Sequence, residues 1–173
     1  EGSSLLLDVA GGSGIYSAAL LQANPGLRAI VWERPEVVKV ARELAAQYDL
    51  GDRLECADAD MFVDEIPDGV DTILLSNVLH DWDVPECRSL VARLAEALPP
   101  GGRLLVHDVF LNDELDGPLP IALYSAALFS LTEGRAYSVA EYTSWMEEAG
   151  LQVGKLAPTL VHCGVLAGIK DGE

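Results

Sequence analysis

One histidine stands at a position where chemistry is expected. His80 lies in the stretch SNVLHDWD, residues 76–83, directly after an apolar run that predicts a buried strand. Ligands of open α/β sheets bind at the carboxyl ends of the strands. Imidazole has an ordinary pKa of about 6.5, so His80 can accept a proton near neutral pH. Taken alone, His80 can equally be a hydrogen-bonded residue that ends the strand and caps the next helix.

A glycine-rich turn, DVAGGSG, ends the first apolar run at residues 8–14. Glycines in such a turn let backbone N–H groups approach a ligand. Asp8 begins the turn, and Glu33 closes the next apolar run 25 residues later. A carboxylate at the tip of a second strand can accept hydrogen bonds from both hydroxyls of a ribose. The alternative is a tight turn of purely structural importance beside a solvated Glu33.

Three other glycine motifs fit this turn less well. The phosphate loop of ATP- and GTP-binding proteins requires a lysine, and none follows Gly14. The dinucleotide fingerprint G-x-G-x-x-G fails at its third glycine, where Ser17 stands. The serine-hydrolase elbow G-x-S-x-G around Ser13 fails because Ile15 replaces its last glycine.

The elements that must position these residues alternate along the chain. Strands are predicted at 5–7, 28–33, 52–60, 70–77 and 103–111, and helices at 15–23, 37–48, 84–98 and 139–149. Ser138 and Glu141 form a capping box for the last of these helices. Residues 151–170 predict an antiparallel hairpin that turns around Pro158. The alternation predicts an α/β fold with a doubly wound, mostly parallel sheet in one domain, residues 1–173.

Composition excludes several classes of partner. The 173 residues carry a net charge of −17, which disfavours nucleic acid and anionic membrane surfaces. No apolar run reaches the roughly 18 residues of a membrane span. The three cysteines, at positions 56, 87 and 163, match no zinc or disulfide pattern, which favours a reducing, cytoplasmic location. The acidic segment 58–65 lacks the calcium-loop pattern, so no metal site is predicted.

Several motifs stand in an order that resembles a known family. DVAGGSG, VWERPEVV, DADMF, LHDWD and ALPPGGRLLVHD resemble the S-adenosylmethionine-dependent O-methyltransferases of the plant caffeate-type and bacterial natural-product group. The resemblance covers essentially the whole chain. It implies a Rossmann-like class I methyltransferase domain with S-adenosylmethionine as cofactor, S-adenosylhomocysteine as product and a hydroxylated aromatic or polyketide-like small molecule as acceptor.

The family places a separate N-terminal dimerisation domain before this half, so the intact protein is expected to be a homodimer. That domain would explain the abrupt start of the chain. It would also cover residues 119–131, which are more apolar than a lone surface helix should be. Tyr124 and Phe129 in this segment could instead line an acceptor pocket or belong to the core.

The resemblance also implies a cofactor site. Its residues would be Asp8, Gly11, Gly12, Gly14, Glu33, Asp60, Met61 and Trp82. The first four would face the methionine and ribose parts, and Glu33 would accept hydrogen bonds from the ribose hydroxyls. Asp60 and Met61 would border the adenine, with Trp82 as a wall beside it.

In the same way, His80 falls on the family's general base, and Asp108 falls on one of two acids that flank this base. Asp108 would hold the second ring nitrogen of His80 and stabilise its protonated form. Two departures concern this site and the glycine turn. Ala136 stands where the second flanking acid is expected, and Ala10 stands where the family prefers glycine, which an alanine tolerates if its φ is negative. His107, next to Asp108, is expected to point to the opposite face and to serve packing.

Three alternative functions remain open at this point. The first is methylation at carbon or nitrogen with the same cofactor, since Ala136 could mark relaxed base catalysis. The second is a dinucleotide-dependent oxidoreductase, against which the missing third glycine argues. The third is a non-catalytic binding module that keeps the fold but acts on no acceptor.

Overall fold

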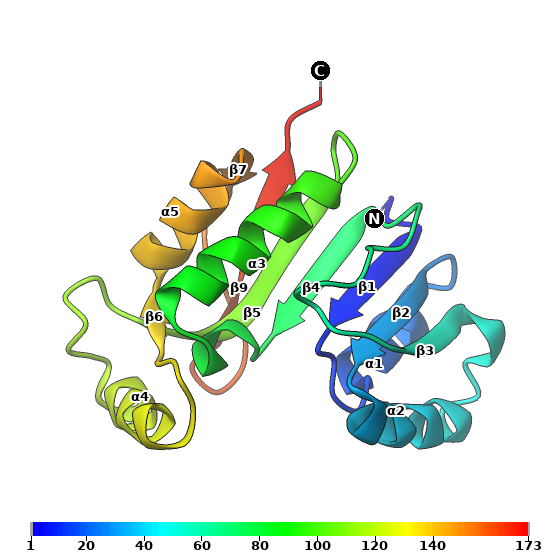
Figure 1. Ribbon diagram of the computed structural model, residues 1–173, viewed down its shortest axis with the longest axis horizontal. Coiled ribbons are helices and arrows are strands. Elements are labelled where there is room, and N and C mark those ends of the chain that lie inside the picture. Colours follow the sequence, from blue (N-terminus) through cyan, green and yellow to red (C-terminus); the bar gives the residue numbers. More distant parts are fainter. Residues whose placement is uncertain (1, 173) are drawn as a thin grey trace. The chain divides into compact units, whose positions relative to one another are not determined.

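The computed structural model describes residues 2–172 and divides the chain into two compact units. The first unit ends at Leu75 and the second begins at Ser76. Figure 1 shows the first unit in blue through cyan to the bluish green of β4 and the second in green to red. The fold is mixed α/β with a mainly parallel sheet and antiparallel strands near the C-terminus, which confirms the predicted fold class.

The first unit is built on parallel strands in the order β3-β2-β1-β4. Its elements are β1 (Leu5–Val9), α1 (Ile15–Ala23), β2 (Arg28–Glu33), α2 (Pro35–Gln47), a 3-10 turn η1 (Gly51–Arg53), β3 (Leu54–Asp58) and β4 (Thr72–Ser76). Strands β1, β2 and β4 are mostly buried, as uniformly apolar parallel strands require. Helices α1 and α2 pack on β2 and β3 and contact each other.

The second unit is built around the long strand β5. Its elements are η2 (Leu79–Asp81, a 3-10 turn), α3 (Val84–Ala97), β5 (Arg103–Leu111), α4 (Leu119–Leu131), β6 (Tyr137–Ser138), α5 (Val139–Glu148), β7 (Leu151–Val153), β8 (Ala157–Pro158) and β9 (Cys163–Lys170). Strand β9 runs antiparallel to β5, β7 and β8, while β6 adds a short parallel pair to β5. Helices α3 and α5 pack side by side, α3 on β5 and α5 on β7 and β9 (Figure 1).

Local signals in the sequence explain where the helices of this unit begin. Asp83 caps α3, and its side chain accepts a hydrogen bond from the N–H of Val84. Ser138 and Glu141 form the expected capping box at the start of α5. Gly150 follows α5 with φ 81°, a left-handed conformation that stops the helix.

The C-terminal hairpin has more parts than the sequence predicts. Its first arm is two short strands, β7 and β8, separated at Gly154 through Leu156. Both pair with β9, so the predicted antiparallel arrangement is confirmed. Strand β6 has no counterpart in the prediction, because two residues are too few for a periodic pattern. Among residues 2–172, no helix is long and apolar enough to cross a membrane.

Candidate active site

The glycine turn of the first unit joins β1 to α1. Gly12 and Gly14 have φ values of 57° and 73°, so both occupy the left-handed region that glycine adopts most easily. A Cβ atom on Gly11 would lie 2.6–2.9 Å from the carboxyl group of Asp8, so only glycine fits above this side chain. The backbone of the turn is thereby held close over Asp8. The N–H groups of Gly11, Gly12 and Gly14 all donate hydrogen bonds within this unit, and these bonds hold the turn in place.

Asp8 is buried directly beneath this turn. Its Oδ2 accepts a hydrogen bond from the hydroxyl of Ser17 at 2.7 Å, while its Oδ1 is buried without a hydrogen-bond partner among the described residues. Burial raises the pKa of Asp8 to about 6, against the opposing hydrogen bond from Ser17 and with help from the charge of Glu33. Ser17 therefore has a function of its own at the position of the missing third glycine.

Glu33 reaches the turn from the end of β2. Its Oε2 accepts a hydrogen bond from the N–H of Gly12 at 3.1 Å, and its Oε1 accepts from the N–H of Arg34 at 2.8 Å. Strands β1 and β2 are neighbours, and the N–H of Gly11 donates to the carbonyl of Trp32. The structure thus brings Asp8, the glycines and Glu33 together at one end of the parallel strands.

Asp60 and Met61 follow the end of β3, the next strand of this unit. Asp60 is exposed, and its Oδ1 accepts a hydrogen bond from the N–H of Phe62 at 2.9 Å. The side chain of Asp64 accepts from the N–H of Asp60, which closes a tight turn. A backbone hydrogen bond fixes the start of this segment after β3: the N–H of Ala59 donates to the carbonyl of Glu33.

Ala10 departs from the expectation at this turn. Its φ is 51°, so the condition of a negative φ is not met. An alanine in the left-handed region is strained, because its Cβ approaches the carbonyl oxygen, at a cost of about 1–2 kcal/mol. The strain lies at the mouth of the glycine turn, where strained backbone is common in ligand sites.

In the second unit, His80 and Asp108 form a buried pair. His80 lies on η2 and Asp108 lies on β5, and their side chains are 5% and 1% exposed. Nδ1 of His80 is 2.7 Å from Oδ1 of Asp108, so this oxygen can accept a hydrogen bond from the N–H of Nδ1. The N–H of Val109 donates to the same oxygen, and the hydroxyl of Tyr142 donates to Oδ2. This geometry leaves Nε2 of His80 as the nitrogen that can accept a proton.

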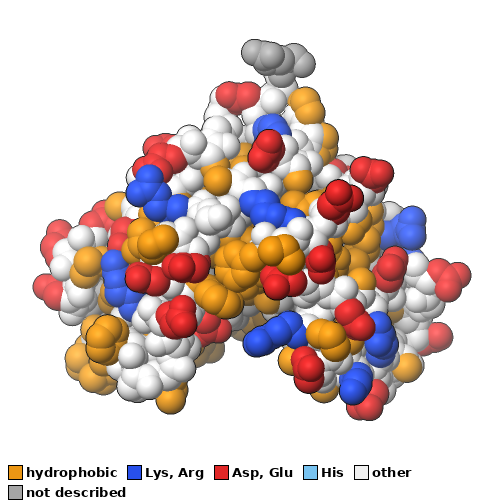
Figure 2. Space-filling view, in the orientation of Figure 1, with side chains coloured by type: hydrophobic (Ala, Val, Ile, Leu, Met, Phe, Trp, Pro, Cys, Tyr) orange, Lys and Arg blue, Asp and Glu red, His pale blue; other side chains and the backbone are white. Residues whose placement is uncertain are grey.

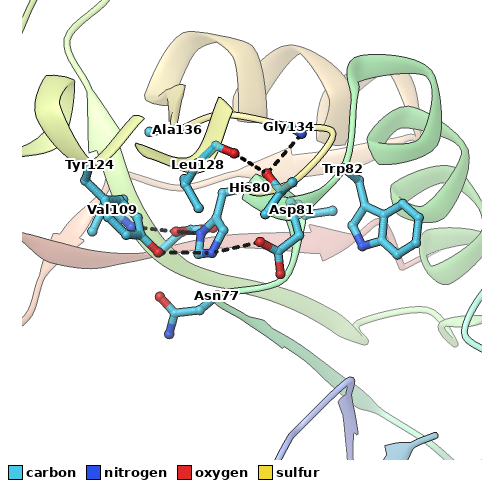
Figure 3. A network of polar contacts seen from close by, with 12 residues as sticks. Asn77, His80, Asp81, Trp82, Val109, Tyr124, Leu128, Gly134 and Ala136 are labelled. Carbon is cyan, nitrogen blue, oxygen red and sulfur yellow. Dashed lines mark hydrogen bonds and ion pairs between the residues drawn. The ribbon is translucent and has the colours of Figure 1, made fainter. Parts of the chain in front are cut away.

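The Nε2 side of His80 faces two further groups. The hydroxyl of Tyr124 lies 3.4 Å from Nε2, and a carboxyl oxygen of Asp81 lies 3.7 Å from it. Figure 3 shows the imidazole between these two side chains. Burial lowers the pKa of His80, but the hydrogen bond to Asp108 and the charges of Asp108 and Asp81 outweigh burial, so the pKa is raised. Sequence reasoning missed Asp81 as a neighbour of the His80 ring, although it directly follows this residue.

The backbone of the His80 turn is closely packed. A Cβ atom on Gly134 would lie 2.5 Å from the carbonyl oxygens of His80 and Trp82. The carbonyl of Trp82 also accepts a hydrogen bond from the hydroxyl of Tyr137 at 2.6 Å. The indole of Trp82 lies on the side of Asp81 that faces away from the ring of His80 (Figure 3).

The second flanking acid has no substitute at its expected position. Ala136 is fully buried in an apolar cluster with Val109, Leu111 and Ile121. Glu141 pairs with Arg135 and caps α5, so it is engaged elsewhere. In residues 2–172, no group of three or more acidic, histidine or cysteine side chains is arranged to hold a metal ion.

The structure also shows the surroundings of His107, Tyr124 and Phe129. His107 is not a simple packing residue, because its Nδ1 lies 2.8 Å from the hydroxyl of Ser76 and its Nε2 lies 3.4 Å from that of Thr159. Tyr124 touches His80, whereas Phe129 on the same helix is 79% exposed. Of the two aromatic candidates for the acceptor site, only Tyr124 therefore lies beside His80.

Comparison with known proteins identifies the family. Residues 1–152 match the O-methyltransferase domain family, and the chain belongs to it. This confirms the resemblance found in the sequence. The 3-hydroxy-5-methyl-1-naphthoate 3-O-methyltransferase of Streptomyces sahachiroi is 37% identical over 98% of this chain and 50% of its own length. The L-tyrosine C(3)-methyltransferase of Streptomyces lavendulae is 37% identical over 87% of this chain and 42% of its own length.

Solved structures of methyltransferases have the same fold as this chain. An O-methyltransferase family 2 protein from Planctomyces limnophilus, in complex with apigenin, is 57% identical with a TM-score of 0.93, over 96% of this chain and 50% of that one. Human N-acetylserotonin methyltransferase, in complex with S-adenosylmethionine, is 28% identical with a TM-score of 0.89, over 98% of this chain and 48% of that one. The chain therefore spans about half the length of the relatives it matches.

Proposed function

We propose that this chain is the catalytic domain of an enzyme that transfers a methyl group from S-adenosylmethionine to a hydroxyl of an aromatic or polyketide-like small molecule. Family membership supports the cofactor and the reaction class. The observation that carries the proposed chemistry is the buried His80–Asp108 pair, which leaves one imidazole nitrogen free to accept a proton.

The residues of the glycine turn fit such a cofactor. Asp8, Gly11, Gly12 and Gly14 would hold its methionine and ribose parts. The glycines let the backbone approach a ligand closely, and a buried carboxyl oxygen of Asp8 has no hydrogen-bond partner among the described residues. Glu33 would accept hydrogen bonds from the ribose hydroxyls in addition to the N–H of the turn.

The adenine would be bordered by Asp60 and Met61, with Trp82 as a further wall. Asp60 is exposed after β3, so its carboxylate can accept a hydrogen bond from an amino group. When bound, the cofactor supplies an electrophilic methyl group on a positively charged sulfur. The protein then has to orient an acceptor oxygen in line with that methyl group and remove its proton.

His80 would perform the proton transfer. A phenol has an ordinary pKa near 10, so at neutral pH its oxygen becomes a good nucleophile only when a base takes its proton. Nε2 of His80 would accept that proton while the oxygen–carbon bond forms and the sulfur–carbon bond breaks. Asp108 would stabilise the resulting imidazolium through Nδ1. The hydroxyl of Tyr124, a phenol that lies 3.4 Å from Nε2, supports this role of the nitrogen.

Methylation at carbon is the second candidate, because a relative with 37% identity is named L-tyrosine C(3)-methyltransferase. The absence of an acid at Ala136 is compatible with it. Both candidates use the same cofactor, so the position of the new methyl group in the product separates them.

We further propose that a separate N-terminal domain completes the protein and makes it a cytoplasmic homodimer. Two observations support the additional domain and the dimer. The chain spans about half the length of its relatives, and helix α4 exposes large apolar side chains. Figure 2 shows hydrophobic side chains gathered over α4. The exposed residues are Leu119, Leu123, Tyr124, Phe129 and Leu131.

The test is a product assay with methyl-labelled S-adenosylmethionine and a panel of naphthols, flavones and hydroxylated polyketides. The proposal predicts a labelled methyl ether whose oxygen attachment is read by NMR. A carbon-methylated product would favour the second candidate. No product together with micromolar binding of S-adenosylhomocysteine would indicate a non-catalytic module, and binding of NAD alone would indicate an oxidoreductase.

A further inference from the structure

A tyrosine stands behind the His80–Asp108 pair and is fully buried. Tyr142 lies on α5, and its hydroxyl donates a hydrogen bond to Oδ2 of Asp108 at 3.1 Å. The other oxygen of this carboxylate, Oδ1, is 2.7 Å from Nδ1 of His80 and accepts from the N–H of Val109 at 2.8 Å. Both oxygens are therefore held, and the plane of the carboxylate is fixed from two sides.

The ring of Tyr142 has little freedom to move. It packs edge-on against Phe110, Trp145 and Tyr137, with centroid distances of 5.4, 5.3 and 5.8 Å. Such contacts between aromatic rings are directional and add to the stability gained from burial. Helix α5 is itself fixed at its start by the capping box at Ser138. The position of the hydroxyl is therefore set by the core of the unit.

The hydroxyl also stays protonated. Burial raises the pKa of Tyr142 well above its ordinary value, and the nearby charge of Asp108 raises it further. Over the whole range in which an imidazole titrates, Tyr142 is consequently a hydrogen-bond donor to the carboxylate.

We propose that Tyr142 is a positioning residue for methyl transfer, whose hydroxyl holds the carboxylate of Asp108 in the orientation that keeps a proton on Nδ1 of His80 and leaves Nε2 free. The inference rests on the proposed function. Without the hydroxyl, Oδ2 would be a buried acceptor without its partner, and the charge of the carboxylate would act more fully on the ring of His80. In such a variant both ring nitrogens would carry a proton over a wider range of pH, so Nε2 would be free for less of the time.

The same hydrogen bond has an electrostatic consequence. The hydroxyl of Tyr142 donates a hydrogen bond to Asp108 and partly offsets its negative charge. It therefore weakens the attraction of the carboxylate for the imidazolium form of His80. Removing the phenol should therefore raise the pKa of His80 further. A base with a raised pKa is protonated, and hence inactive, over a wider range of pH.

The experiment compares Tyr142→Phe with Tyr137→Phe. Tyr137 is a matched control because it is fully buried in the same aromatic cluster, but its hydroxyl donates to the carbonyl of Trp82. In Tyr142→Phe, the acidic limb of the kcat/KM profile should move to higher pH by about half to one pH unit. At pH values on the acidic side of the limb, kcat/KM should therefore be about threefold to tenfold lower. KM for S-adenosylmethionine should not change, and most of the lost rate should return at pH 9. In Tyr137→Phe the limb should stay in place.

A second measurement follows His80 itself. The chain has three histidines, so the ring signals can be assigned by NMR with single-histidine variants. The pKa of His80 should rise in Tyr142→Phe and remain in place in Tyr137→Phe. If Tyr142→Phe does not fold, 3-fluorotyrosine at position 142 keeps the shape of the ring and donates more strongly, so the pKa of His80 should fall.

The outcomes separate two failures. If the unaltered protein transfers no methyl group, the proposed function is wrong, and the NMR titration still decides whether Tyr142 acts on His80. If methyl transfer occurs but the limb and the pKa of His80 are unmoved or shift downward in Tyr142→Phe, the positioning role is wrong. An equal rate loss at every pH would also overturn it, because that pattern indicates a purely structural role.

Discussion

Replacing Asp108 by asparagine removes the charge behind His80 and keeps the size of the side chain. The asparagine oxygen can face His80 and Val109, as Oδ1 does now, and its amide group can face Tyr142, whose hydroxyl can turn to accept. The geometry should therefore survive, and the effect should be electrostatic. The buried, charge-assisted bond at 2.7 Å is worth about 1.5–3 kcal/mol to the imidazolium, or about tenfold to 150-fold in kcat.

The pH dependence of Asp108→Asn has a defined sign. Burial lowers the pKa of His80, and the hydrogen bond and charge of Asp108 raise it, so the pKa should fall in the variant. The acidic limb of kcat/KM should move to lower pH while the plateau drops. The raised pKa also stabilises the folded protein below about pH 6.5, and this contribution is lost as the pH rises through the folded-state pKa. The stability gap between the two proteins should therefore be largest below pH 6.5.

The assay is methyl transfer from pH 5 to pH 9, with urea unfolding at both ends of the range. Asp68→Asn, which removes an exposed carboxylate, is the control and should leave the profile unchanged. A plateau within twofold of the unaltered protein, or an acidic limb that does not move, would refute the role of Asp108.

Three further predictions concern the glycine turn and the His80 turn. Glu33→Gln should weaken binding of S-adenosylhomocysteine about tenfold by calorimetry, whereas Glu36→Gln should leave it unchanged; equal affinities would argue against ribose binding at Glu33. Gly134→Ala forces a Cβ atom against backbone carbonyls, so methyl transfer should fall at least tenfold, while Gly26→Ala meets no atom within 4 Å and should be silent. Ala10→Gly relieves a φ of 51° and should stabilise the fold by about 0.5 kcal/mol in urea; destabilisation would contradict the strain.

Regular elements could be predicted because their signals are local. The strands at 28–33 and 103–111 and the helix at 15–23 match the structure residue for residue. Each is bounded by turn residues or caps that act within a few positions. The split hairpin and the two-residue strand β6 could not be predicted, because their pairing depends on partners distant in the sequence.

The candidate site was predictable in part. His80 and Asp108 stand in recognisable motifs, and the structure places them 2.7 Å apart. Tyr142 and Tyr124 carry no such motif, and only the packing of α4 and α5 brings their hydroxyls to the pair. The left-handed φ of Ala10 could not be predicted either, because the sequence does not indicate how much backbone strain a turn tolerates.

The most direct test of the account is methyl transfer by His80→Ala, with binding of S-adenosylhomocysteine measured on the same sample. The account predicts that turnover falls by about a hundredfold or more while the affinity for S-adenosylhomocysteine stays the same. His162→Ala, which removes an exposed imidazole, should keep both properties. Turnover retained in His80→Ala would contradict the central claim that this histidine accepts the proton of the acceptor hydroxyl.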